Sequence, residues 1–103
     1  MTDSRRKGRD AEREVERIIE ARGIEVDRSL GGRKQPHGDL AIPGVRIDSK
    51  RQERLQLIPW SREQEAKVPD HLTPAIAYRT NGEPWRVSCL LSDFLDLYQA
   101  STT

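Results

Sequence analysis

Helices are predicted where apolar residues recur every three or four positions along the chain. The longest such segment spans residues 5–22 and ends at Gly23, where the pattern stops. A short second helix is expected over residues 61–67, because Ser61 and Gln64 have the spacing of a capping box and a proline follows soon after. Ser92 predicts the start of a third helix near the end of the chain. The apolar face of the first helix consists of Ala11, Val15, Ile18 and Ile19.

Strands are predicted where apolar and polar residues alternate, or where a short apolar run is bounded by turns. Pro43-Gly44 and Asn81-Gly82 each provide a turn that can join two strands into a hairpin. The order is then helix, three strands, helix, two strands, helix. This order predicts an α/β sandwich with a central mixed five-stranded sheet flanked by helices (αβββαββα). The expected strands cover residues 24–28, 40–42, 45–50, 74–79 and 85–89.

The length and composition are those of one small domain over residues 1–103, with a basic N-terminal segment at residues 1–8 and a frayed tail at residues 100–103. Only 34% of the residues are hydrophobic and 34% are charged, so the core is expected to be modest and a partner subunit would help to stabilise it. A single cysteine, Cys89, excludes an internal disulfide framework and makes a cytoplasmic protein the simplest interpretation. No apolar run reaches the roughly 20 residues of a membrane span, so no membrane partner is expected.

Positive charge is concentrated in three places, although the formal net charge is only +1. These places are the start of the chain, the glycine-rich loop at residues 29–37, and the segment after the first hairpin. Such a loop can be an ordinary solvated connection or can grip phosphates, and its position directly before Asp39 favours the second interpretation. The basic residues in these three places are Arg5, Arg6, Lys7, Arg9, Arg33, Lys34, Lys50, Arg51 and Arg54.

The hairpin at residues 38–50 carries the residues with the clearest chemistry. Asp48 and Lys50 share one face of its second strand, because successive side chains of a strand point to opposite faces. Asp39 opens the first strand, so the hairpin can bring two carboxylates and an ammonium group together, a set that suits a hard divalent cation with an activated water. The simpler alternative is an exposed ion pair between Asp48 and Lys50, worth under about 1 kcal/mol.

The first helix offers a further carboxylate at the border of its apolar stripe. Glu12 lies on one side of the stripe and Glu14 on the other, and periodicity alone does not choose between them. The histidines are expected in loops rather than as metal ligands, because hard cations prefer oxygen. The tryptophans are expected to anchor the core or an interface. These four residues are His37, His71, Trp60 and Trp85.

Three features follow one another along the chain: an acid on the first helix, an aspartate that opens the second expected strand, and an acid-x-lysine sequence on the third expected strand. In this order they resemble the PD-(D/E)xK nuclease superfamily and, within it, the archaeal-type Holliday junction resolvases. The resemblance covers the first half of the chain and implies a restriction-endonuclease-like α/β sandwich. Asp48 stands where the resolvases usually have glutamate, and the proline expected directly before Asp39 is absent. The matching residues are Lys7-Gly8 with Ala11-Glu12-Arg13, Arg28-Ser29 with the basic loop, Gly38-Asp39, and Ile47-Asp48-Ser49-Lys50.

The resemblance implies a catalytic set of Glu12, Asp39, Asp48 and Lys50. Asp39 and Asp48 would bind Mg²⁺ or Mn²⁺, the backbone carbonyl of Ser49 would be a further ligand, and Glu12 would complete the site directly or through water. Lys50 would orient the attacking water or help to deprotonate it. The implied contacts to DNA come from Arg5, Arg6, Lys7, Arg9, Ser29, Arg33, Lys34, Arg51 and Arg54.

The expected function is therefore that of an Mg²⁺-dependent endonuclease that resolves four-way DNA junctions by paired phosphodiester hydrolysis. A homodimer is expected, because symmetric cuts require two sites related by a two-fold axis. So compact a chain would suit a phage protein acting in the host cytoplasm. Two alternatives stay open: a nuclease of the same fold that acts on flaps, ends or nicks, and a non-catalytic DNA-binding protein whose acids pair with nearby cations.

Overall fold

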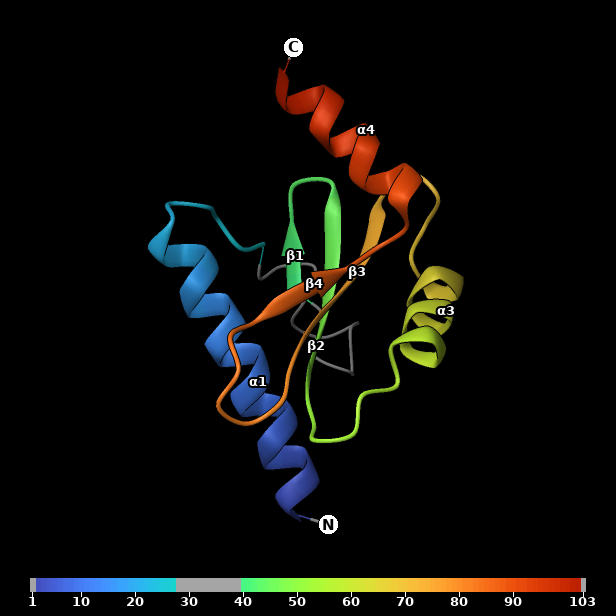
Figure 1. The fold of residues 1–103 in the computed structure, drawn as a ribbon. Coiled ribbons are helices and arrows are strands. Elements are labelled where there is room, and N and C mark those ends of the chain that lie inside the picture. The colour runs from blue at the N-terminus through green and yellow to red at the C-terminus, as the bar shows by residue number, and fades with distance from the viewer. Residues whose placement is uncertain (1, 28–39, 103) are drawn as a thin grey trace.

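The computed structural model of the chain describes residues 2–27 and 40–102, with side chains from residue 8 onward (Figure 1). The described residues contain three helices and four strands. These elements form a mixed α/β fold in which helices flank a sheet. The elements are α1 (Thr2–Ala21), β1 (Leu40–Ile42), β2 (Val45–Arg51), α3 (Leu57–Lys67), β3 (Thr73–Arg79), β4 (Arg86–Ser88) and α4 (Leu91–Thr102).

The sheet has the order β1-β2-β3-β4 and is mixed. β1 and β2 form the predicted antiparallel hairpin, in which Leu40 pairs with Ile47, and Gly44 in the turn has φ of +79°. β2 and β3 are parallel. The connection between them contains α3, which returns the chain to the end of the sheet at which β2 began. β4 then returns antiparallel to β3 and forms an edge of the sheet.

The two faces of the sheet are covered by different helices, which lie on opposite sides of it in Figure 1. On one face, Val15 of α1 packs in a core cluster with Ile47, Ala75 and Ala77. On the other face, α3 packs against the alternate residues of β2, and Gln64 donates a hydrogen bond to the backbone of that strand. Because side chains alternate along β2, its odd-numbered residues face α1 and its even-numbered residues face α3.

The prediction of a strand at residues 24–28 is wrong for residues 24–27, and position 28 lies outside the described residues. Val26 is buried in the core and the backbone N–H of Asp27 donates to the carbonyl of Ala41 at 2.7 Å, so this segment lies along β1 without forming a strand. The described residues therefore contain a four-stranded sheet rather than the five strands predicted. Alternation shows that a segment has two faces, but a strand also requires a regular backbone ladder.

The predicted start of α3 at Ser61 is also wrong, since the helix begins at Leu57. The carbonyl of Gln56 accepts the first helical hydrogen bond, from the N–H of Trp60 at 3.0 Å. Pro59 falls in the first turn of the helix, where its missing N–H needs no partner and its fixed φ suits the helix. The helix ends at Lys67, as predicted.

The last helix, α4, begins at Leu91, and the carbonyl of Leu90 accepts a hydrogen bond from the N–H of Phe94 at 3.0 Å. Ser92 therefore lies inside the helix and is not its cap. The helix continues through Thr102, so residues 100–102 of the expected frayed tail are helical. No residue of α4 is buried, and the helix projects from the sheet in Figure 1.

Candidate active site

The face of β2 that looks toward α3 carries the predicted acid-x-lysine pair. Asp48 is buried, with 7% of its surface exposed, and its Oδ2 lies 3.4 Å from Nζ of Lys50. The side chain of Lys50 is 27% exposed and that of Asp48 is 11% exposed, so the pair lies mostly below the surface. The structure therefore brings these two predicted site residues into direct contact, in a more enclosed setting than an ordinary exposed ion pair.

Helix α3 completes the surroundings of this pair with two residues spaced one helical turn apart. Nζ of Lys50 lies 5.6 Å from the centre of the buried Trp60 ring, within the range of a cation–π contact. Gln64 is 2% exposed, and its Nε2 donates to the carbonyl of Arg46 at 3.1 Å, which fixes α3 to β2. The expectation that Trp60 is a core residue is confirmed. The sequence predicts Gln64 only as part of a capping box. Its contact with β2 joins residues 18 positions apart, and no local pattern signals it.

The opposite face of the sheet holds a second charged cluster, centred on Glu14. Its Oε2 accepts from Nη1 of Arg51 at 2.9 Å. Its Oε1 accepts from Nε and Nη2 of Arg79, at 3.1 and 2.9 Å, and from Nε1 of Trp85 at 3.2 Å. The Arg79 guanidinium also lies over the Trp85 ring, 5.4 Å from its centre. One carboxylate thus joins α1, β2, β3 and the segment before β4.

These contacts determine the charge state of Glu14. Burial by itself would raise the pKa of the carboxyl group. The hydrogen bonds from Arg79 and Trp85 and the positive charges of Arg79 and Arg51 act against burial, and the net result is a pKa below the ordinary value of 4.5. Glu14 is therefore a carboxylate held by the protein's own cations, and its role in the structure is to fix α1 to the sheet.

The sequence left Glu12 and Glu14 as equal candidates for a carboxylate that leans toward the sheet. Glu14 makes the contacts with the sheet described above. Glu12 is half-buried on the same helix, and α1 packs on the face of the sheet opposite to the one that carries Asp48 and Lys50. The helix that supplies the predicted third acid thus lies across the sheet from the acid-x-lysine pair.

The other residues singled out from the sequence differ in exposure and in contacts. Arg9 and Arg54 are exposed, whereas the guanidinium of Arg51 is engaged by Glu14. Ser49 faces α1, and its buried Oγ has no hydrogen-bond partner in the described part of the structure. His71 is an exposed turn residue, as expected. The residues that lie outside the described residues or have undescribed side chains are Arg5, Arg6, Lys7, Ser29, Arg33, Lys34, His37 and Asp39.

A divalent cation at this site needs more than one carboxylate. Among the described side chains, those of residues 8–27 and 40–102, no three His, Cys, Asp or Glu groups gather closely enough to hold a metal ion. Asp48 supplies one carboxylate, already close to an ammonium group. Asp39 lies outside the described residues, but β1 begins at the next position, Leu40, which pairs with Ile47 beside Asp48. The donor set fits a metal only if a second acid joins Asp48.

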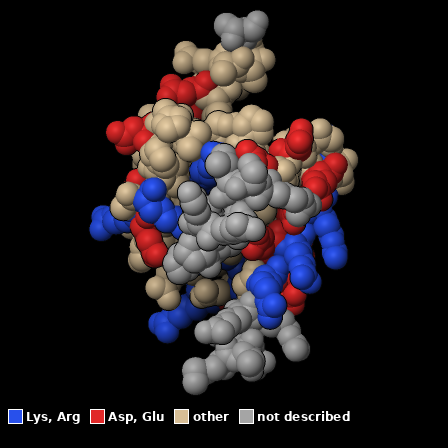
Figure 2. Space-filling view, turned by 180° about the vertical axis from the view of Figure 1, so that it is seen from behind, with Lys and Arg blue, Asp and Glu red and all other residues tan. Residues whose placement is uncertain are grey.

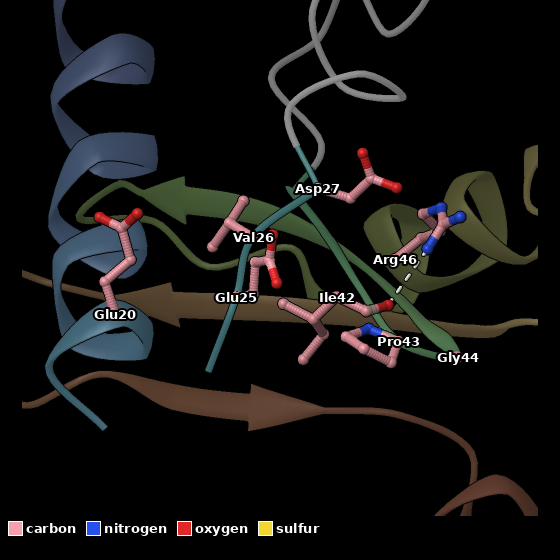
Figure 3. A pocket seen from close by; sticks show the side chains of 8 residues that line it. All are labelled: Glu20, Glu25, Val26, Asp27, Ile42, Pro43, Gly44 and Arg46. Carbon is pink, nitrogen blue, oxygen red and sulfur yellow. Dashed lines mark hydrogen bonds between the residues drawn. The ribbon is translucent and has the colours of Figure 1, made fainter. Parts of the chain in front are cut away.

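A cavity of about 730 Å³ opens beside the hairpin, on the side of the β1–β2 turn (Figure 3). Its lining mixes apolar and charged side chains, and Arg46 borders it with a guanidinium that donates to the carbonyls of Ile42 and Val45 at 3.2 and 3.0 Å. Arg46 is on the same face of β2 as Asp48 and Lys50, but its guanidinium is turned toward the hairpin backbone. The residues that line the cavity are Glu20, Glu25, Val26, Asp27, Ile42, Pro43, Gly44 and Arg46.

Surface charge is mixed rather than uniformly basic. Figure 2 shows the face opposite to that of Figure 1, where Lys and Arg side chains form separate groups with Asp and Glu between them. Such a surface gives local contacts to an anionic partner rather than one continuous electrostatic field. Among the described residues, no helix has the length and apolar character needed to cross a membrane.

The sequence matches no protein-family model, and comparisons with curated proteins and with solved structures find no match either.

Proposed function

We propose that this protein is a divalent-metal-dependent DNA endonuclease that resolves four-way junctions by paired phosphodiester hydrolysis. The proposed catalytic residues are Asp39, Asp48 and Lys50, with Glu12 as an outer member. Mg²⁺, or Mn²⁺ in its place, would lower the pKa of a bound water and stabilise charge on the phosphate. The backbone carbonyl of Ser49 would be a further ligand.

One observation carries the proposal. Asp48 and Lys50 are enclosed between β2 and α3, in contact at 3.4 Å, and Trp60 packs against the amine. A buried carboxylate that keeps an amine at the edge of solvent is poorly explained by stability alone, since a surface pair of this kind contributes under about 1 kcal/mol and burial adds a desolvation cost. An acid that binds a metal next to an amine that orients water is consistent with this arrangement.

Two further acids belong to the proposed site. Asp39 belongs to the proposal because it directly precedes Leu40, and Leu40 pairs with the neighbour of Asp48. Glu12 belongs to α1, which packs on the opposite face of the sheet, so its place in the proposal comes from the family resemblance alone. Two such sites, related by the axis of a homodimer, would provide the paired cuts.

DNA binding would depend on phosphate contacts. The exposed basic residues Arg9 and Arg54 are candidates, together with the basic positions outside the described side chains. Contacts of this kind make affinity fall steeply with salt and make it largely independent of sequence. Arg51 contributes little to direct contact in this proposal, because Glu14 already engages its guanidinium.

The test compares cleavage of a synthetic four-way junction by the wild type, Asp48→Asn and Asp70→Asn in the presence of Mg²⁺. Asp70 is exposed in the turn before β3, so its variant makes the same chemical change away from the site. Asp48→Asn is expected to lower the cleavage rate by at least about 100-fold, with junction affinity retained, and Asp70→Asn to leave the rate unchanged. Equal cleavage by wild type and Asp48→Asn would refute the assigned site.

Lys50→Met separates the two roles at the site. The methionine keeps most of the apolar stem that packs on Trp60 but removes the amine, so it is expected to slow cleavage while Mn²⁺ binding, measured by titration calorimetry, is retained. Asp48→Asn is expected to weaken both. A panel of junctions, flaps, nicked duplexes and free ends at one salt concentration would show whether a different branched or broken DNA is the preferred substrate.

A non-catalytic DNA-binding protein is the second candidate. It is favoured by the closed Asp48–Lys50 contact and by the absence of a three-acid cluster among the side chains of residues 8–27 and 40–102. In that case the charged pair would only position α3 on the sheet. Junction affinity without any Mn²⁺ binding or cleavage would establish this alternative.

A further inference from the structure

Helix α4 carries an apolar surface that nothing in the described part of the structure covers. None of its residues is buried. The exposed fractions of its large apolar side chains run from 40% to 71%, with Leu91 the most exposed. We define the α4 patch as Leu90, Leu91, Phe94, Leu95, Leu97 and Tyr98.

The spacing of these residues makes the patch one continuous face. Leu91, Phe94, Leu95 and Tyr98 stand at i, i+3, i+4 and i+7, the pattern of a helix that packs against a neighbour. At about 100° per residue, Asp93 and Asp96 fall on the far side of the helix. An amphipathic helix of 12 residues is marginal by itself in water, and its stability normally comes from the packing of its apolar face.

The size of the patch is that of a subunit interface. An aromatic side chain offers on the order of 150–250 Å², and we take roughly 170 Å² for each residue of the patch because most of them are leucines. The exposed fractions of the six residues then correspond to roughly 550 Å² per chain, and two copies meeting through the patch would bury about 1,100 Å² of total surface. A biological interface is expected to clear about 1,000 Å², and the largest apolar patch on a monomer, roughly 300–600 Å², is often a functional surface.

The charges of α4 indicate what kind of partner fits. Its only charged side chains are two aspartates, which would repel the phosphates of DNA and of anionic lipids. Helices that lie on membranes carry Lys or Arg on the polar face, and α4 has neither. Asp96 lies away from the patch, whereas Asp93 borders it beside Leu97, so two copies that pack along the Leu91, Phe94, Leu95 and Tyr98 stripe would bring no like charges into the contact.

We propose that the α4 patch is the surface through which two copies of this chain associate about a two-fold axis, with the two α4 helices antiparallel. The helix projects from the sheet, so a second copy can reach it, and an antiparallel pair sets the helix dipoles in the favourable sense (Figure 1). An isologous contact needs one self-complementary patch, and an apolar stripe flanked by polar residues meets this need. The inference rests on the proposed homodimer and names the surface that forms it.

The experiment measures the mass of the full chain in solution by sedimentation equilibrium. At about 100 µM, well above the micromolar dissociation constants of weak interfaces of this size, the wild type is expected at twice the monomer mass of 11.8 kDa. Leu91→Glu is expected to weaken the dimer by at least about 30-fold, since it places two charges in the contact. Ser92→Glu, the next residue on the polar side, adds the same charge in the same turn and is expected to leave the dimer intact.

The outcomes are separable from those of the nuclease test. A monomeric wild type would overturn the inference, as would a folded Leu91→Glu variant that stays dimeric or a Ser92→Glu variant that dissociates equally. Circular dichroism checks the fold, and Tyr98→Glu replaces Leu91→Glu if the latter does not fold. A monomer that sediments with phosphatidylcholine vesicles would overturn it in favour of a membrane surface. A dimer that cuts no DNA supports the interface while refuting the proposed function.

Discussion

Glu14→Gln tests the charge network that fixes α1 to the sheet. The substitution keeps the shape of the side chain but removes its charge, and it turns one acceptor oxygen into an NH₂ donor. In the wild type that carboxylate accepts hydrogen bonds from Arg51, Arg79 and Trp85. In the variant, an amide donor faces at least one guanidinium donor in a half-buried position. We therefore expect a loss of stability larger than that of a typical surface substitution.

The magnitude follows from the number and kind of these contacts. A hydrogen bond to a charged group contributes about 1.5–3 kcal/mol, and removing one partner of a fully buried pair costs about 3–5 kcal/mol. The Glu14 side chain is 30% exposed, and glutamine can still accept through its remaining oxygen, so both figures are upper limits here. We expect the free energy of unfolding to fall by about 2 kcal/mol at neutral pH.

The same network predicts how this difference changes with pH. The folded pKa of Glu14 is lowered below its ordinary value of 4.5, so its contribution is fully present above pH 4.5 and is lost as the pH falls through the folded pKa. The gap between wild type and Glu14→Gln should therefore be constant from neutral pH down to about 4.5 and should shrink below it. Glutamine does not titrate, so the variant lacks this component of acid sensitivity.

Urea unfolding at neutral pH and near pH 3, followed by circular dichroism, measures both effects. Glu63→Gln is the matched control, because Glu63 is exposed on α3 and is expected to change stability by less than about 0.5 kcal/mol. A Glu14→Gln variant no less stable than this control at neutral pH would refute the network as a source of stability. A gap that widens on acidification would refute the assigned direction of the pKa shift.

Three further predictions concern the core, the candidate site and the cysteine. Ile76 is 1% exposed, so Ile76→Ala should lower the free energy of unfolding by about 3 kcal/mol, whereas Ile58→Ala, at a position 63% exposed, should change it by under about 0.5 kcal/mol in the same urea titration. Trp60→Phe should keep an aromatic ring near Lys50 and lose less stability than Trp60→Leu, whose cost we place at about 2 kcal/mol; equal losses would argue against the cation–π contact. Burial raises the pKa of the Cys89 thiol, and the charge of Asp93 raises it further, so iodoacetamide should modify it more slowly at mildly alkaline pH than it modifies a free cysteine; an equal rate would contradict this.

The sequence by itself determined much of the fold. Helical periodicity predicted α1 and α4, and turn residues predicted the β1–β2 hairpin, because these signals act between residues close in the chain. Alternation along β2 placed Asp48 and Lys50 on one face, and the structure confirms their contact at 3.4 Å. The mixed sheet flanked by helices followed from the order of these elements.

Only the tertiary structure decided which faces meet. The two acids at the border of the apolar stripe on α1 are equivalent by periodicity, and Glu14 is distinguished by arginines that come from β2 and β3. Residues 24–27 alternate like a strand but form no ladder beside β1. The apolar residues of α4 have the spacing of a helix that packs against a neighbour, yet no residue of that helix is buried. These outcomes depend on contacts between segments far apart in the chain, and local patterns carry no information about which distant partner a face will find.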